Sequence, residues 1–214
     1  MRRLAWLLGL PLGLAAVAVG SLWVWSGAEG SLATALRQAP RFLPPSVTVS
    51  AQDVTGSLRH GGSLASLTVT AEGQTVVART VTFQWHPLAL WDRHLQLDSL
   101  QIADLNIQTV AQDGPKSPPP TDLSLPLRIS AHLKVGKLAV SGASAFAASQ
   151  LDLRYDHNDA THTLLLDSLQ VAAGRYRGKV TLGANEPLAL NAHVQAVVTT
   201  PVPGSTRSLT LQGQ

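Results

Sequence analysis

The sequence contains no cysteine among its 214 residues, and only 14% of its residues are charged. Without cysteine the chain has no disulfide scaffold, thiolate metal site, iron–sulfur cluster or thiol nucleophile. The formal net charge is +3, and Arg2 and Arg3 supply two of these charges, which leaves about +1 for the rest. A nucleic-acid-binding protein needs a concentrated basic face, and the sequence has none. We therefore expect no nucleic-acid partner.

Catalytic and metal-binding motifs are also missing. The seven histidines are scattered, and none stands in an H-E-x-x-H pattern. There is no Walker loop, no G-x-G-x-x-G and no nucleophile-elbow motif. His157 and His162 flank a turn with Asp156 and Asp159, where a solvated hairpin is favoured over a metal site. We predict a protein that is not an enzyme and that has no cofactor and no metal.

One long uncharged run opens the chain, from Leu4 to Ala28. As a helix, its 22 residues from Leu4 to Trp25 would measure about 33 Å, enough to cross a bilayer. Because Arg2 and Arg3 precede the run, the positive-inside rule places the N-terminus in the cytoplasm. A cleaved signal peptide is the alternative, but the run exceeds a typical signal core. The predicted membrane-anchor residues are Leu4, Trp6, Leu14, Val19, Trp23 and Trp25.

The remainder is predicted to be all-β. A short helix is expected in SLATALRQA, capped by Ser31 and ending before Pro40. After that, apolar residues alternate with polar ones, which is typical of half-buried antiparallel strands. The alternating segments are 47–49, 67–71, 81–85, 95–97, 100–102, 105–107, 123–129, 133–135, 138–140, 151–155, 164–166, 169–171, 180–182, 188–192 and 209–211.

These patterns divide the chain into five parts. Residues 1–28 form the cytoplasmic tip and transmembrane signal-anchor helix, and residues 29–46 form a short helix and linker. Residues 47–111 form a first β block, and residues 123–214 form a second. A proline-rich loop at 112–122 separates the two blocks.

An internal repeat suggests that the strands stack in a row. The segment LDSLQIA at 97–103 recurs as LDSLQVA at 166–172, with one difference. Residues 133–140 share its spacing, h-x-h-x-x-h-x-h, where h is apolar. Repeated strand units of this kind favour an elongated stack over a closed globule.

The order of three apolar motifs resembles a known family. The motifs are V-x-G-x-L at 54–58, W-x-P-x-x-L at 85–90 and L-x-L-x-x-L-x-I at 95–102, behind a single anchor. This order resembles the N-terminal region of the TamB family (translocation and assembly module subunit), in the AsmA-like, bridge-like lipid-transfer group. The resemblance implies an elongated, antiparallel, folded-over β-sheet with an apolar groove, behind one transmembrane helix.

The resemblance also implies a location and partners. It implies a single-pass inner-membrane protein with its bulk in the periplasm, active in phospholipid transfer to the outer membrane and in outer-membrane protein assembly. The implied partners are phospholipid acyl chains, the inner membrane and a BamA-like outer-membrane barrel. Members of the family are several times longer, so the chain is expected to continue in a longer parent protein whose C-terminal part contacts the barrel.

In such a groove the inward residues of neighbouring strands share one apolar surface. A lipid tail gains about 0.8 kcal/mol for each buried CH₂ group. The same pattern also fits the dry core of a β-sandwich, and periodicity does not separate the two. Rival functions are a lipopolysaccharide-bridge component with one anchor and a β jelly roll, and an envelope scaffold that binds no lipid. The lipid-groove candidates are Leu95, Leu97, Leu100, Ile102, Leu105, Ile107, Ile129, Leu133, Val135, Leu138 and Val140.

Overall fold

A computed structural model describes residues 21–71, 73–109, 122–142, 145–172, 174–186, 188–199 and 206–213 of the chain. Residues 21–27 are helical. Within the described ranges, no helix combines the length and apolar character that a membrane crossing requires. Most of the predicted anchor, residues 1–20, lies outside the described residues, so the anchor stays a prediction.

Strands make up nearly all of the rest. The helical elements are α2 (Ser31–Gln38) and two 3-10 helices, η1 (Ala39–Arg41) and η2 (Pro87–Asp92). The strands are β1 (Val47–Gln52), β2 (Thr55–Ser57), β3 (Gly61–Ala71), β4 (Gln74–His86), β5 (His94–Gln108), β6 (Arg128–Ser141), β7 (Phe146–Asn158), β8 (Thr161–Val171), β9 (Gly174–Gly183), β10 (Leu190–Thr199) and β11 (Thr206–Gly213).

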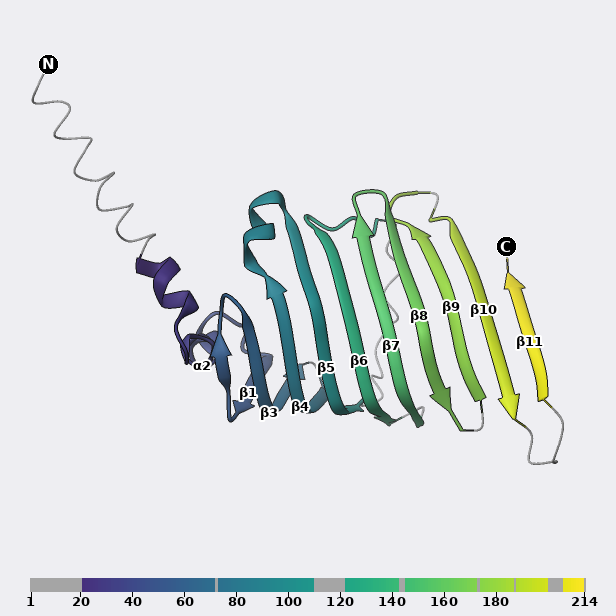
Figure 1. Ribbon diagram of the computed structural model, residues 1–214, viewed down its shortest axis with the longest axis horizontal. Helices are drawn as coiled ribbons and strands as arrows, with labels where there is room; N and C mark the ends of the chain where they lie inside the picture. The colour runs from purple at the N-terminus through teal and green to yellow at the C-terminus, as the bar shows by residue number, and fades with distance from the viewer. Residues whose placement is uncertain are drawn as a thin grey trace, which may run out of the picture.

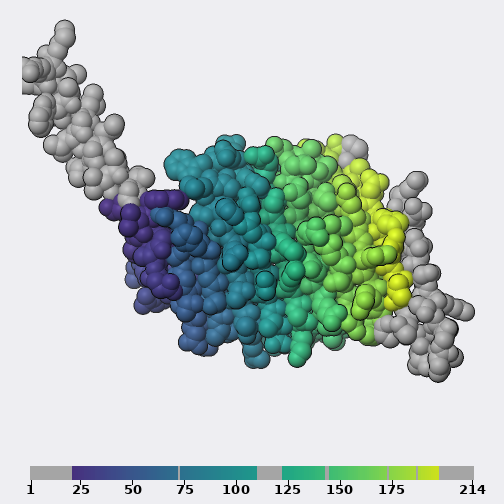
Figure 2. Space-filling view, viewed as in Figure 1, coloured from purple at the N-terminus to yellow at the C-terminus, as the bar shows by residue number. Residues whose placement is uncertain are grey.

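All of these strands belong to one open sheet. Its order is β1-β3-β4-β5-β6-β7-β8-β9-β10-β11, and the short β2 pairs with β3 beside this path. Strands that follow one another in sequence therefore lie side by side, as Figure 1 shows. In the space-filling view, the described body runs from blue to yellow in one direction without folding back on itself (Figure 2). The predicted all-β class and elongated stack are confirmed.

The prediction that every strand pair is antiparallel is wrong at one position. β5 and β6 run parallel, with Leu100 beside Leu133 and Ile102 beside Val135. A parallel pair needs a connection that returns the chain to the end where the first strand began. Here the backbone N–H of Arg128 bonds the carbonyl of Arg93, which places the start of β6 beside the start of β5. The connection between these strands contains the proline-rich segment, whose length suits such a return.

The proline-rich segment was predicted to separate two β blocks. Residues 110–121 lie outside the described residues, and the strands before and after them join the same sheet through the β5–β6 pair. The predicted strand at 123–129 begins later than expected, because β6 starts at Arg128. The residues before it bond elsewhere: the N–H of Leu123 donates to the carbonyl of Ala184.

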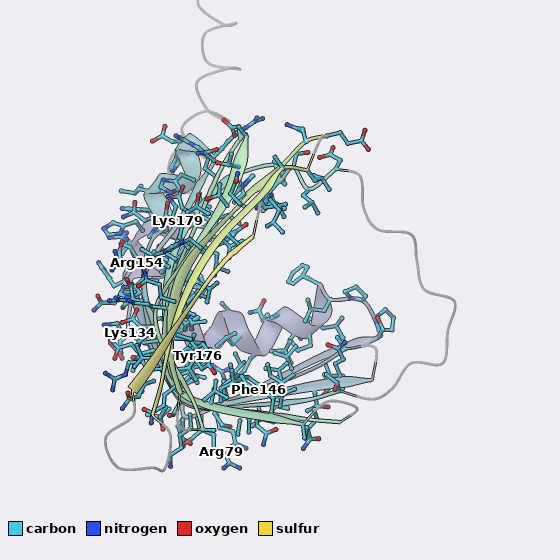
Figure 3. All side chains as sticks on the ribbon, turned by 90° about the vertical axis from the view of Figure 1, so that its right-hand side faces the viewer. Arg79, Lys134, Phe146, Arg154, Tyr176 and Lys179 are labelled. Atoms are coloured by element: carbon cyan, nitrogen blue, oxygen red, sulfur yellow. The ribbon has the colours of Figure 1, made fainter. Side chains whose placement is uncertain are left out.

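The sheet is curved, and the spacing of its apolar residues explains where it bends. Along the sheet axis, the strands curve into a C (Figure 3). On β4 and β5, the buried residues Ala78, Val81 and Ile102 face one side, with two residues rather than one between successive inward side chains at the bend. Because side chains alternate between the two faces, residues separated by two others, such as Ala78 and Val81, lie on the same face only if the backbone of the strand bends between them. We call the line of bend residues, one on each of β3–β7, the crease: Ala65, Thr80, Ala103, Gly136 and Gln150.

The crease is strained and closely packed. Thr80 and Gln150 adopt positive φ angles of 51° and 52°, which are unfavourable for residues with a side chain. At Gly136 an added Cβ would stand 2.7 Å from the carbonyl oxygen of Ala103 on the neighbouring strand. Glycine is therefore required there by the close approach of another backbone. In residues 133–140 the h-x-h-x-x-h spacing is the sequence form of this bend, because its two-residue gap contains Gly136. In the repeat at 97–103 the gap contains Asp98 and Ser99, where the pairing register of β5 shifts instead.

The helix α2 lies inside the C at the β1–β3 end of the sheet (Figure 3). Its Leu32 is buried and its Leu36 packs against the core cluster of Leu64 and Val81. The predicted cap was wrong: Gly30, in the left-handed region, holds the N-cap position. The Ser31 hydroxyl instead accepts the N–H of Leu58 and donates to the carbonyl of Ser26, which ties the helix to the loop after β2.

Candidate functional site

The two faces of the curved sheet differ in chemistry. Phe146 and Tyr176 project into the concave side, whereas Arg79, Lys134, Arg154 and Lys179 project outward (Figure 3). Residues paired across a sheet share one face, so the register extends this division from strand to strand. One row on the concave side reads Phe83, Leu100, Leu133, Leu153, Leu166, Gly178 and Val194. This row of the concave face is therefore free of polar side chains from β4 to β10.

The predicted groove residues all lie on this concave face. Each one on β5 is the direct neighbour of an apolar residue on β6: Leu95 with Ile129, Leu97 with Ala131, Leu100 with Leu133, Ile102 with Val135, Leu105 with Leu138 and Ile107 with Val140. The sequence predicted which residues of β5 and β6 face inward. It did not predict that the two strands run parallel, which is what places these residues side by side. The eleven candidates thus form one connected surface over two adjacent strands.

Burial divides the concave face into two regions. Near the crease, Val135 is 1% exposed and Ile102 is 9% exposed, so this region is a dry core. Toward the C-terminal half of the sheet, Leu164 is 36% exposed and Leu190 is 57% exposed, on the same face. The two interpretations of the apolar pattern, core and groove, therefore apply to different parts of one face.

The convex face carries the ion pairs. The carboxylate of Asp152 accepts from His132 at 2.7 Å and lies 3.5 Å from the Lys134 ammonium. Burial acts to raise the pKa of Asp152, but the His132 hydrogen bond and the Lys134 charge together outweigh it and hold that pKa below its usual value. On the next strands, Arg154 pairs with Asp167 at 2.8 Å. The convex face is therefore the solvent-facing side of the sheet.

A polar cluster interrupts the concave face where β7 meets β8. Tyr155, His157 and His162 share that face, and the two imidazoles stack with ring centroids 4.2 Å apart. The Nε2 of His162 donates to the carbonyl of Leu123, so its Nδ1 accepts the Tyr155 hydroxyl at 2.7 Å. Burial, and to a lesser degree the Asp156 charge, raises the pKa of Tyr155.

The sequence did not predict this cluster. His157 was expected on a solvated hairpin, but it is 1% exposed, and neither ring nitrogen has a hydrogen-bond partner among the described residues. Inward alternation on β7 was the available signal, because it places His157 two residues after Tyr155 on the apolar side. In the described ranges, no three histidine, aspartate or glutamate side chains form a group able to hold a metal ion.

The described part of the predicted anchor contacts the body of the protein. Trp23 and Trp25 lie on the helical turn at 21–27; Leu4, Trp6, Leu14 and Val19 lie outside the described residues. The Arg59 guanidinium stacks over the Trp23 ring at 3.9 Å from its centroid and also donates to the Trp23 carbonyl. The backbone N–H of Arg59 bonds the Ser26 carbonyl. These contacts attach the end of the helix to the loop after β2.

Comparison with known proteins identifies no relative: no family model matches the chain, and no curated protein or solved structure is significantly similar to it.

Proposed function

We propose that the chain is the N-terminal part of a TamB-like envelope protein, anchored in the inner membrane, whose curved sheet carries phospholipid acyl chains on its concave face. In this role it takes part in phospholipid transfer to the outer membrane and in protein assembly there, beside a BamA-like barrel. The observation that supports the proposal is the division of one open sheet into an apolar concave face and a charged convex face.

The energetics favour an acyl chain on the C-terminal half of the concave face. Burying ten CH₂ groups would contribute about 8 kcal/mol before the entropy of binding is subtracted. Leu164 and Leu190 are exposed there, whereas Ile102 and Val135 are already covered by protein. We therefore place the lipid-binding region on β7–β10, and we assign the candidates on β5 and β6 mainly to the floor and core that hold the curvature.

Two rival functions fit the fold less well. A β jelly roll packs eight strands into two sheets, whereas the described strands form one sheet. A scaffold that binds no lipid would gain nothing from leaving Leu164, Leu190 and Phe146 exposed on one face, since exposed apolar surface costs solubility. The lipid-carrying role accounts for both features.

The proposal is tested by placing a charge on either face at adjacent positions. Leu164 points into the concave side, and Leu165, beside Arg154 and Lys179, points outward. The full chain is reconstituted in donor vesicles, and transfer of a fluorescent phospholipid to acceptor vesicles is measured. We expect Leu164→Glu to abolish transfer and Leu165→Glu to retain it. Equal transfer by wild type, both variants and empty donor vesicles would refute the proposal.

A further inference from the structure

The turn between β4 and β5 exposes an unusual amount of apolar surface. We call its exposed residues Leu88, Leu90 and Trp91 the tip; they are 56%, 43% and 83% exposed. They lie on η2, which Pro87 begins and Arg93, in the left-handed region, ends. A water-facing turn gains nothing from two leucines and a tryptophan, and clustered exposed apolar residues typically mark a binding surface. Figure 1 shows this turn at one rim of the sheet, at the upper end of β4.

The tip lies beside the end of the predicted membrane anchor. A cavity of about 420 Å³ is lined by residues of both, including Trp23 from the helical turn and Pro87 and Leu88 from η2. Arg59 also lines it, and its stacking on Trp23 fixes the helical turn against the body. The indole of Trp85 in the same cavity donates to the Leu58 carbonyl at 2.8 Å. The helical turn at 21–27 and the tip are therefore held in a defined relation.

Basic side chains flank the tip. Arg93 is exposed directly after η2, and Arg128 reaches η2 through a 3.2 Å hydrogen bond to the Asp92 carbonyl. The single carboxylate of η2 is that of Asp92, so Arg93 and Arg128 leave the turn itself with a net positive charge, and the neighbouring Asp98 is paired with His86 at 2.6 Å. Tryptophan and leucine between arginines are the composition that sits at the boundary of hydrocarbon and anionic headgroups. The chemistry matches a phospholipid bilayer.

We propose that the tip inserts into the interfacial layer of the same membrane that holds the anchor, with Arg93 and Arg128 on anionic phospholipid headgroups. This inference rests on the anchor in the proposed function. Two attachments, the helix at Trp23 and the tip at Trp91, fix the angle of the sheet against the bilayer. The membrane-facing rim of the sheet is then the rim at which β5 and β6 begin, next to the floor of the concave face.

The absence of native cysteine allows a clean test. Single cysteines at Leu90→Cys and, as control, at Gln74→Cys are labelled with an environment-sensitive nitrobenzoxadiazole dye. Gln74 is exposed at the opposite end of β4. The full chain is reconstituted in vesicles of phosphatidylcholine with phosphatidylglycerol. At Leu90 we expect blue-shifted emission, quenching by headgroup-proximal spin-labelled lipid and several-fold weaker quenching by aqueous iodide than at Gln74. Equal, water-like behaviour of both labels overturns the inference.

Two further measurements separate this inference from the proposed function. Replacing the arginines, as Arg93→Gln with Arg128→Gln, should return the Leu90 label toward water, and phosphatidylcholine alone should do the same in the wild type. If the labelled chain floats with vesicles but the Leu90 label stays in water, the tip inference fails and the anchor stands. If the chain does not float, the anchor and the tip inference fail together, and photocrosslinking at Leu164 still tests the concave face by itself.

Discussion

The crease makes an unusual prediction about Gly136. Replacing glycine by alanine in ordered structure normally stabilises a protein by about 0.4–1 kcal/mol when the backbone conformation allows alanine. The φ angle of Gly136 is not in the positive region, so conformation alone would permit the change. However, the new Cβ would stand 2.7 Å from the Ala103 carbonyl oxygen, and backbone on β5 would have to move. We expect Gly136→Ala to destabilise by about 1–3 kcal/mol, as overpacking does.

The assay is urea unfolding of the full chain in detergent, followed by circular dichroism in the β band. The control is Lys137→Ala, the next residue on the same strand, which is exposed and should change stability by less than about 0.5 kcal/mol. A Gly136→Ala variant as stable as wild type, or more stable, would refute the close β5–β6 approach. The explanation of the bend would then have to be abandoned.

Three other predictions concern packing and charge. Val135→Ala should lower the free energy of unfolding by about 2 kcal/mol, because Val135 is only 1% exposed. Val197 is 43% exposed, so Val197→Ala should change stability very little, and thermal unfolding compares the two variants. Asp152→Asn should lose about 1 kcal/mol at neutral pH through its bond to His132. Because folding lowers the pKa of Asp152, the stability lost in this variant should shrink as the pH falls below about 4, toward the pKa of Asp152 in the folded protein. Denaturant unfolding of both proteins at several pH values measures this change. Tyr155→Phe should lower the free energy of unfolding by about 1 kcal/mol, because it removes the hydroxyl that donates to the Nδ1 of His162. Denaturant unfolding at neutral pH measures this loss.

Alternation alone predicted most of the strands and their inward faces. It predicted Leu100, Ile102 and Leu105 on one surface, although two residues separate Ile102 from Leu105, and the structure places them together. Spacing carries this information because side chains alternate with a period of two wherever the strand is regular. The short helix after the anchor was also predicted within one residue of α2.

Pairing direction and burial depth were not predictable in the same way. Whether β6 runs with or against β5 depends on where the chain returns, and the composition of the connection does not encode that. His157 and Val135 are equally buried, yet the sequence predicted a solvated hairpin for His157 and an inward-facing groove position for Val135. Burial depends on curvature and on what lies above a face, which are properties of the whole sheet. In the sequence, Leu88 and Leu90 of the tip appeared only within the W-x-P-x-x-L motif, because the exposure of the tip depends on the arrangement of the whole sheet.

If acyl chains occupy the concave face of β7–β10, site-specific photocrosslinking in cells should capture them there. A photoreactive residue is placed at Leu164, with Leu165 as the outward neighbour and Ile102 as a buried concave position. Adducts are identified by mass spectrometry. We expect phospholipid adducts at Leu164, none at Leu165 and few at Ile102. Absence of lipid at Leu164, or equal adducts at Leu164 and Leu165, would contradict the proposal.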